Sequence, residues 1–353
     1  MGAAMTSQGN AMAAELLVVG ASGYAGYASS RLLEKVPAVK QQFGGTAFEH
    51  WKDHFRQRIN ELSIALAENE PALFLSRVQW SRAAFHAREV SENLLKESLI
   101  CLAEVLEKEL PKSICHVPGE YISSAIGSFE DSEIETTELD VKDPITNLGM
   151  RYMLQVLEGN FQSAIKLIVD AHQDGLPIES AYEALMTAQR EIGRMWHHAE
   201  VNIAEEHIVT STTERVMSIL AFQAGKQPAN GLTVVSAAVA GNSHDIGVRI
   251  VSDFFDFAGW KAICLGGDLP ATDIAQAVQF FDSSLVLISA ALSTQLKSIR
   301  GSVNAVRGLN SNCKILVGGT AFLDSPEIWQ QLGADGYAAS PTEAVSIGTS
   351  LMK

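Results

Sequence analysis

The last third of the chain alternates short apolar runs with segments whose apolar residues recur at helical spacing. The apolar runs lie near 232–240, 261–265, 284–290, 314–317 and 335–339, and a closing helix is expected from Pro341. Short buried strands that alternate with helices form a parallel sheet with helices on both faces. Residues 231–353 are therefore expected to form a doubly wound α/β domain with a five-stranded parallel sheet.

The residues before this region show a helical pattern only. Residues 144–225 contain four amphipathic segments, which predict a four-helix bundle: 145–157, 161–172, 178–196 and 201–222. Residues 1–126 are also expected to be helical, with segments at 51–67, 73–88 and 92–109 and a shorter piece after Pro118. The acidic stretch within 127–143 has few residues that could fill a core, which is typical of a linker.

A glycine-rich segment near the start imitates a nucleotide-binding turn. Residues 17–26 place Gly20, Gly23 and Gly26 after an apolar run. A dinucleotide fingerprint needs a strand, a helix and a second strand that ends in an acidic residue. The residues that follow have a helical pattern, so an N-terminal helix is expected instead.

Composition and charge exclude several classes of function. The chain has 353 residues, 47% of them hydrophobic, and a formal net charge of −15. Because phosphate binding depends on Lys and Arg, this acidity argues against direct contact with nucleic acid. Four scattered cysteines give neither a disulfide framework nor a zinc site. With no apolar run of membrane-spanning length, we expect a cytoplasmic protein.

The loop 241–247 lies between the first expected strand of the sheet and a helix, and ligands of open α/β sheets bind at the carboxyl ends of strands. It resembles the Asp-x-His-x-x-Gly motif of cobalamin-binding domains. The resemblance implies that His244 displaces the cofactor's own base and coordinates cobalt from below. The loop residues expected at the cofactor are Asn242, Ser243, His244, Asp245 and Gly247.

The chemistry of this loop agrees with the resemblance, because a neutral imidazole is a good cobalt ligand. Asn242 stands where the family usually has a carboxylate. An amide oxygen can accept the imidazole N–H, but we expect a weaker donor to cobalt. The alternative is a helix-capping Asn and a surface His on an ordinary flavodoxin-like domain.

Two distant elements match the same family. Ser289 ends the third expected strand, where the family has a Ser-x-Leu contact to the displaced base, although Ala290 and Ala291 follow it here. Gly318 and Gly319 match the family's Gly-Gly pair, where missing side chains let the nucleotide tail lie against the backbone.

The helical bundle carries a second motif, in which nine residues separate Trp196 from Glu206. This resembles the Trp-x9-Glu-His motif of CarH-type cobalamin photoreceptors. The resemblance implies adenosylcobalamin, with Trp196 beside the adenosyl group and with Glu206 and His207 lining the same pocket. It also implies that His197 binds cobalt once light has expelled the adenosyl group. The alternative is a core aromatic residue among ordinary histidines.

The helical bundle at 144–225 corresponds to the cap that covers the cofactor in such photoreceptors. The first domain, residues 1–126, resembles the globin-like sensor domains that precede this cap in photocobilins, which bind a linear tetrapyrrole in addition to adenosylcobalamin. The resemblance implies a bilin such as biliverdin, contacted by Trp80, Arg82 and His86. Arg82 and His86 are four residues apart and share a helix face. An exposed polar face of a core helix explains them equally well. A thioether to Cys101 or Cys115 is a further option, although Cys101 lies in an apolar run.

Together these resemblances predict a light sensor that carries adenosylcobalamin and a bilin, has no catalytic turnover, and signals through self-association or a protein partner. The alternative is a corrinoid carrier that moves methyl groups to a methyltransferase. A third option is a stress-signalling scaffold whose globin-like domain is empty. The cap discriminates between the first two, because a carrier must open its cap to an enzyme and has no need of Trp196 and His197 beside Glu206 and His207.

Overall fold

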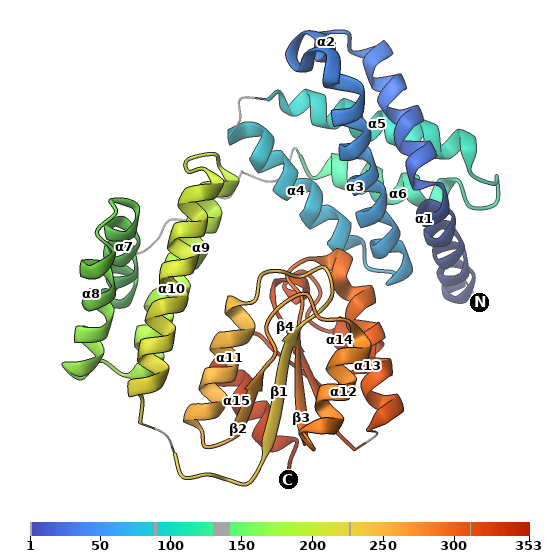
Figure 1. Cartoon of the computed structure of the whole chain (residues 1–353). Coiled ribbons are helices and arrows are strands. Elements are labelled where there is room, and N and C mark those ends of the chain that lie inside the picture. Colours follow the sequence, from blue (N-terminus) through green and yellow to red (C-terminus); the bar gives the residue numbers. More distant parts are fainter. Residues whose placement is uncertain (1, 88–89, 130–141, 226, 311) are drawn as a thin grey trace. The chain divides into compact units, whose positions relative to one another are not determined.

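A computed structural model describes the chain except for residues 1, 88–89, 130–141, 226 and 311 (Figure 1). The chain forms two compact units, Met1–Glu135 and Thr136–Lys353. Each unit has its own buried core. Most of the expected linker 127–143 lies outside the described residues.

The first unit is helical throughout its described residues. Its α-helices are α1 (Gly2–Lys35), α2 (Ala38–Phe43), α3 (Ala47–Ala67), α4 (Pro71–Ala87), α5 (Glu92–Glu109) and α6 (His116–Gly127). The glycine-rich segment lies inside α1, as the sequence predicts. Helix α1 packs along α3 and α5, and Leu17, Leu32 and Leu62 are fully buried. The likeness of this unit to globins remains a prediction.

The second unit begins with four helices, which we call the cap: α7 (Pro144–Leu157), α8 (Phe161–Gln173), α9 (Ile178–His197) and α10 (Ile203–Gln223). Local chemistry sets two of the helix starts. The Asp143 carboxylate accepts from the backbone N–H of Thr146, and Pro144 occupies the first turn of α7. Asn202 and Glu205 form a capping box at the start of α10. The four helices lie where the apolar periodicity predicts them.

A five-stranded sheet follows the cap. Its strands are β1 (Thr233–Ala238), β2 (Lys261–Cys264), β3 (Leu285–Ser289), β4 (Lys314–Gly318) and β5 (Gly336–Ala338). All pairs are parallel, in the order β2-β1-β3-β4-β5. The predicted parallel sheet is confirmed, and its order is the flavodoxin-like one. The order reverses direction between β1 and β3, where ligands bind in sheets of this type.

Helices pack against the sheet between and after its strands. They are α11 (Ile246–Phe257), α12 (Ala271–Phe280), α13 (Leu296–Leu309), α14 (Ile328–Leu332) and α15 (Pro341–Ser350). Helices α11 and α15 contact each other, and so do α12 and α13 (Figure 1). Helix α11 also contacts the cap, because Ile250, Phe254 and Phe257 belong to the cap's apolar core. The helix that follows the His244 loop thus joins the cap to the sheet.

A pair of glycine substitutions tests the packing within the cap. A Cβ at Gly149 on α7 would lie 2.4 Å from the backbone oxygen of Ala184 on α9, whereas a Cβ at Gly193 has no neighbour within 4 Å. We expect Gly149→Ala to lower the free energy of unfolding by about 1–3 kcal/mol through overpacking. Gly193→Ala should raise it by about 0.5–1 kcal/mol through helix propensity. Urea unfolding followed by circular dichroism measures both. Equal effects of the two variants would contradict the close α7–α9 contact.

Candidate functional site

The His244 loop connects the carboxyl end of β1 to the first turn of α11. Five hydrogen bonds fix its backbone and neighbouring side chains. The N–H of Gly241 donates to Asp268 Oδ1 (2.7 Å), and Gln295 Nε2 donates to Gly241 O (2.7 Å). The N–H of Asn242 donates to Val239 O (2.9 Å), and its carbonyl accepts from the N–H of Asp268 (2.8 Å). The fifth bond joins Asn242 Nδ2 to Ser289 O (3.4 Å).

His244 is exposed on this tethered loop, as Ser243 and Gly247 are. Asn242 is buried, with 1% of its surface exposed. The amide oxygen of Asn242 accepts from the backbone N–H of His244 at 3.1 Å. The amide therefore orients the loop that carries the imidazole. Because an amide oxygen has two lone pairs, the prediction that it also accepts the ring N–H stays a prediction.

The matched sequence elements meet at one edge of the sheet. The strand register pairs Ala238 with Ser289, and Ser289 with Gly318. This row lies at the carboxyl ends of β1, β3 and β4, next to the His244 loop. The three elements, which lie between residues 241 and 319 of the sequence, are therefore brought together by parallel pairing.

Packing within the protein itself also explains why Gly318 and Gly319 are glycines. Gly319 has a φ of 100°, and a Cβ there would lie 2.2 Å from Ala290 O. A Cβ at Gly318 would lie 2.9 Å from Ala338 O. Because the protein's own backbone approaches so closely, both positions exclude larger residues even without a ligand.

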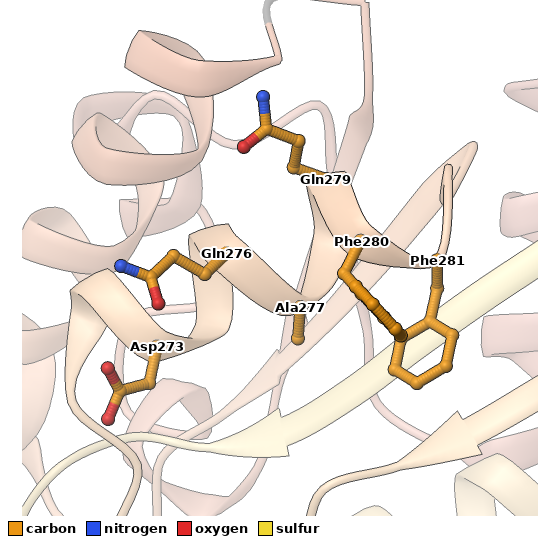
Figure 2. Close-up of a pocket in the computed structure, with 6 residues that line it drawn as sticks. All are labelled: Asp273, Gln276, Ala277, Gln279, Phe280 and Phe281. Atoms are coloured by element: carbon orange, nitrogen blue, oxygen red, sulfur yellow. The ribbon is translucent and has the colours of Figure 1, made fainter.

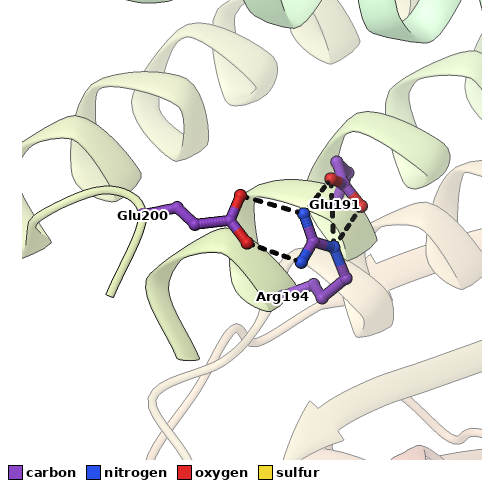
Figure 3. Close-up of polar contacts among 3 residues, drawn as sticks. All are labelled: Glu191, Arg194 and Glu200. Carbon is purple, nitrogen blue, oxygen red and sulfur yellow. Dashed lines mark hydrogen bonds and ion pairs between the residues drawn. The ribbon is translucent and has the colours of Figure 1, made fainter. Parts of the chain in front are cut away.

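The turn between α9 and α10 fixes the spacing of the cap motif. Arg194 on α9 binds Glu191 on the same helix (2.7 Å) and Glu200 in the turn (2.8 Å), as Figure 3 shows. These hydrogen bonds, Glu191 first, raise the pKa of Arg194 above its ordinary value. Ala199 has a φ of 58°, which ends α9, and the capping box at Asn202 starts α10. Trp196 and Glu206 are thereby held at the same end of the cap.

The residues of this cap end differ in exposure. Trp196 is 37% exposed, whereas the adjacent His197 is 9% exposed and lies on the buried side of α9. His207 is exposed, and its Nδ1 lies 2.6 Å from Glu206 Oε2. Trp196 and His207 are exposed and Glu206 is half-buried, so their role at a cofactor stays a prediction. A role for His197 as the upper ligand requires its side chain to leave the cap interior.

One face of α10 contacts α11, the helix that follows the His244 loop. Glu206, Thr210 and Glu214 are four residues apart and share this face. Glu214 lies 4.0 Å from Arg249 of α11, and Arg249 pairs with Asp245 at 2.7 Å. Asp245 follows His244 directly. The Asp245 hydrogen bond raises the pKa of Arg249. Arg249 and Glu214 were not singled out from the sequence, because the periodicity of α11 does not reveal a polar contact with another helix.

The residues expected to contact a bilin all lie on α4 of the first unit. Arg82 binds Glu92 at 2.8 Å and its guanidinium lies 5.3 Å from the Phe129 ring. Trp80 is 38% exposed with Arg77 over its ring, and His86 is exposed. Burial raises the pKa of Cys101 to about 11, which disfavours its reactive thiolate, whereas Cys115 is half-buried.

A buried charged cluster in the same unit was missed from the sequence. Arg58 binds Glu61 (2.9 Å) and Ser81 (2.8 Å), and Arg58 and Glu61 are each 2% exposed. Burial, together with Arg58, lowers the pKa of the neighbouring His54 to about 3. The signal for this cluster was that Arg58 falls on the apolar stripe of α3 that contains Trp51 and Phe55.

A hollow in the second unit lies on α12. Asp273, Gln276, Ala277, Gln279, Phe280 and Phe281 line it, as Figure 2 shows. Phe280 is 81% exposed. The hollow contains none of the residues that the sequence predicts for a site.

Comparison with known proteins adds independent findings. Residues 232–346 match the family model described as B12 binding domain, and residues 151–221 match a second model with that description. Dimethylamine corrinoid protein 3 of Methanosarcina acetivorans is 25% identical over 196 residues, which cover 54% of this chain and 90% of the relative. A corrinoid protein of Desulfitobacterium hafniense is 23% identical over 56% of this chain and 94% of its own length.

A solved structure shares the fold. The monomethylamine corrinoid protein of Methanosarcina barkeri aligns with a TM-score of 0.51 and 19% identity, over 59% of this chain and 99% of that chain. The two B12 segments and the corrinoid homologues support cobalamin binding by this chain. These findings favour the corrinoid methyl carrier, the alternative function, over a light sensor.

Among the residues that the structure describes, no helix combines the length and the apolar character needed to cross a membrane.

The Arg194–Glu200 pair predicts a pH-dependent contribution to stability. The hydrogen bond from Arg194 lowers the pKa of Glu200 below its ordinary value of 4.5. The pair therefore stabilises the fold above that value, and the contribution is lost as the pH falls through the lowered pKa. Because the pair is partly exposed, we expect Glu200→Gln to cost less than about 1 kcal/mol at neutral pH. Chemical unfolding between about pH 6 and pH 3 should show the cost shrinking. The same pH dependence of Glu200→Gln in an Arg194→Gln background would contradict this origin.

Proposed function

We propose that the second unit binds a cobalamin between the cap and the carboxyl edge of the sheet, with His244 as the lower axial ligand. The observation that carries this proposal is the direction of the α10 face. Glu214 contacts Arg249, and Arg249 pairs with Asp245 next to His244, so Glu206 and His244 belong to surfaces that face the same region. The B12 matches cover both of these surfaces.

The residues present fit such a group. The tethered loop holds an exposed imidazole, which as a neutral ligand donates a nitrogen lone pair to cobalt. The buried Asn242 keeps the loop backbone in place at little entropic cost on binding. When bound, a cobalamin supplies a cobalt–carbon bond that the protein does not need to build. Ser289 and the Gly318–Gly319 edge would then lie along the nucleotide tail.

The function that the comparisons support best is methyl carriage for a methyltransferase. The chain covers most of the length of corrinoid proteins that are named for methylamines. In this function the chain itself catalyses no turnover, and its partner is the enzyme that donates or accepts the methyl group. The cap must then move aside, because the partner reaches the upper face of the cofactor.

A second candidate is a light sensor that binds adenosylcobalamin. Trp196, Glu206 and His207 lie at one end of the cap, with the spacing fixed by the Arg194 pair, and a carrier has no need of this set. The indole would detect the adenosyl group, and His197 would bind cobalt after its loss. In this candidate the first unit holds a bilin such as biliverdin, and self-association or a protein partner in the cytoplasm receives the signal.

Replacing His244 tests the proposed lower ligand. We expect His244→Ala to remain folded, because the side chain is exposed, and to lose cobalamin or bind it with a base-off spectrum. Ser243→Ala in the same loop is the matched control and should keep the histidine-ligated spectrum. The measurement is the visible absorption spectrum of protein loaded with cobalamin. A histidine-ligated spectrum in His244→Ala would refute the assignment.

A second experiment separates the two functions. Protein loaded with adenosylcobalamin is illuminated with green or blue light, with and without biliverdin, and protein loaded with methylcobalamin is mixed with a corrinoid methyltransferase in the dark. Methyl carriage predicts demethylation in the dark. The sensor predicts a light-driven spectral change that Trp196→Ala alters, a bis-histidine product that His197→Ala lacks, and a red-region band with biliverdin. Demethylation in the dark, together with an absorption spectrum that light does not change, would exclude the light sensor.

A further inference from the structure

A chain of hydrogen bonds connects the exposed end of the cap to its core. Glu206 Oε1 accepts from Thr210 Oγ1 at 2.8 Å, and Thr210 Oγ1 lies 3.1 Å from Gln189 Oε1. Gln189 Nε2 lies 2.8 Å from Thr213 Oγ1, which is 3.0 Å from the hydroxyl of Tyr152. Tyr152 and Thr213 are completely buried. The chain thus runs from α10 to α9, back to α10 and then to α7.

The number of available protons determines which group donates in each hydrogen bond of this chain. Thr210 has a single hydroxyl proton but lies next to two acceptor oxygens, one on Gln189 and one on Glu206. A carboxylate is the stronger acceptor, so the proton goes to Glu206. If the amide of Gln189 is rotated by half a turn, its N and O atoms exchange places, so that Nε2 donates to Thr210 and Oε1 accepts from Thr213. Every donor and acceptor of the chain then has a partner. Tyr152 donates to Thr213 in that arrangement.

We propose that Thr210 and Gln189 are positioning residues that hold the Glu206 carboxylate toward the upper side of the bound cobalamin. This inference rests on the proposed cobalamin site. Glu206 is 22% exposed as a side chain and is fixed on one oxygen by Thr210 and on the other by His207. A carboxylate held by two partners loses little rotamer freedom when a ligand binds.

The fixed carboxylate selects among upper axial groups. Each carboxylate oxygen has lone pairs beyond the one that Thr210 or His207 uses. A ribose-bearing upper group offers hydroxyl donors to these lone pairs, whereas a methyl group offers none. Thr210 and Gln189 therefore set how strongly the site discriminates between a ribose-bearing upper group and a methyl group.

The test compares isosteric and conservative variants at Thr210. Thr210→Val keeps the shape and removes the hydroxyl, and Thr210→Ser keeps the hydroxyl. Ser211→Ala is the control, because the Ser211 hydroxyl donates to Ile208 O of its own helix. The ratio of the dissociation constants for methylcobalamin and adenosylcobalamin should fall about tenfold in Thr210→Val, as expected for a charge-assisted hydrogen bond. It should stay within about twofold in Thr210→Ser and Ser211→Ala. Gln189→Leu, on the other helix, should lower it in the same direction.

A measurement on cofactor-free protein keeps this inference separate from the proposed function. Glu206→Gln should shift the NMR signals of the Gln189 side-chain amide in the wild type but not in Thr210→Val, because the hydroxyl transmits the change. Failure of wild-type protein to bind any cobalamin would refute the proposed function alone. Two results would overturn the role of Thr210 and Gln189. One is an unchanged ratio of dissociation constants in both Thr210→Val and Gln189→Leu when these variants bind cobalamin. The other is a shift of the Gln189 amide signals on Glu206→Gln in the Thr210→Val background.

Discussion

Helix α11 is the element on which the rest of the second unit depends, because it packs on two cores at once. Phe255 lies in the core of the sheet, where its ring meets that of Trp260, whereas Phe254 and Phe257 meet Tyr182 of the cap. The hydroxyl of Tyr182 also donates to Asp253 at 2.7 Å. Since α11 begins directly after the His244 loop, the packing that holds the cap also fixes the position of that loop relative to it.

The fold of the second unit could be predicted because its signals are local and repeated. The strands of a parallel sheet are buried on both faces, so β1, β3 and β4 appear as continuous apolar runs. The cap helices α8 and α9 each show one apolar face, and their ends lie within a few residues of the predicted ones. The strand order and the docking of α11 on the cap depend on contacts between distant residues, which no local pattern contains.

The sequence predicted the candidate site only where the spacing of residues determines which side chains meet. The positions of His244, Ser289 and Gly318 at one edge follow from parallel pairing of strand ends. The bond from the backbone N–H of His244 to Asn242 did not follow, because the sequence pattern does not show which N–H groups a buried amide serves. The orientation of His197 into the cap also did not follow, since a residue at the last turn of a helix can face either side. The hydrogen bond between Thr210 and Gln189 joins two helices, so the periodicity of either helix does not reveal it.

The contacts between the cap and α11 differ in strength along the helix. Phe254 and Phe257 are almost completely buried, and each such side chain contributes about 1.5–3 kcal/mol. Arg249 and Glu214, nearer the His244 loop, are 46% and 42% exposed and 4.0 Å apart, and such a pair contributes about 0–1 kcal/mol. A cap that separates from the sheet at the Glu206 end while Tyr182 stays packed therefore loses the least stability.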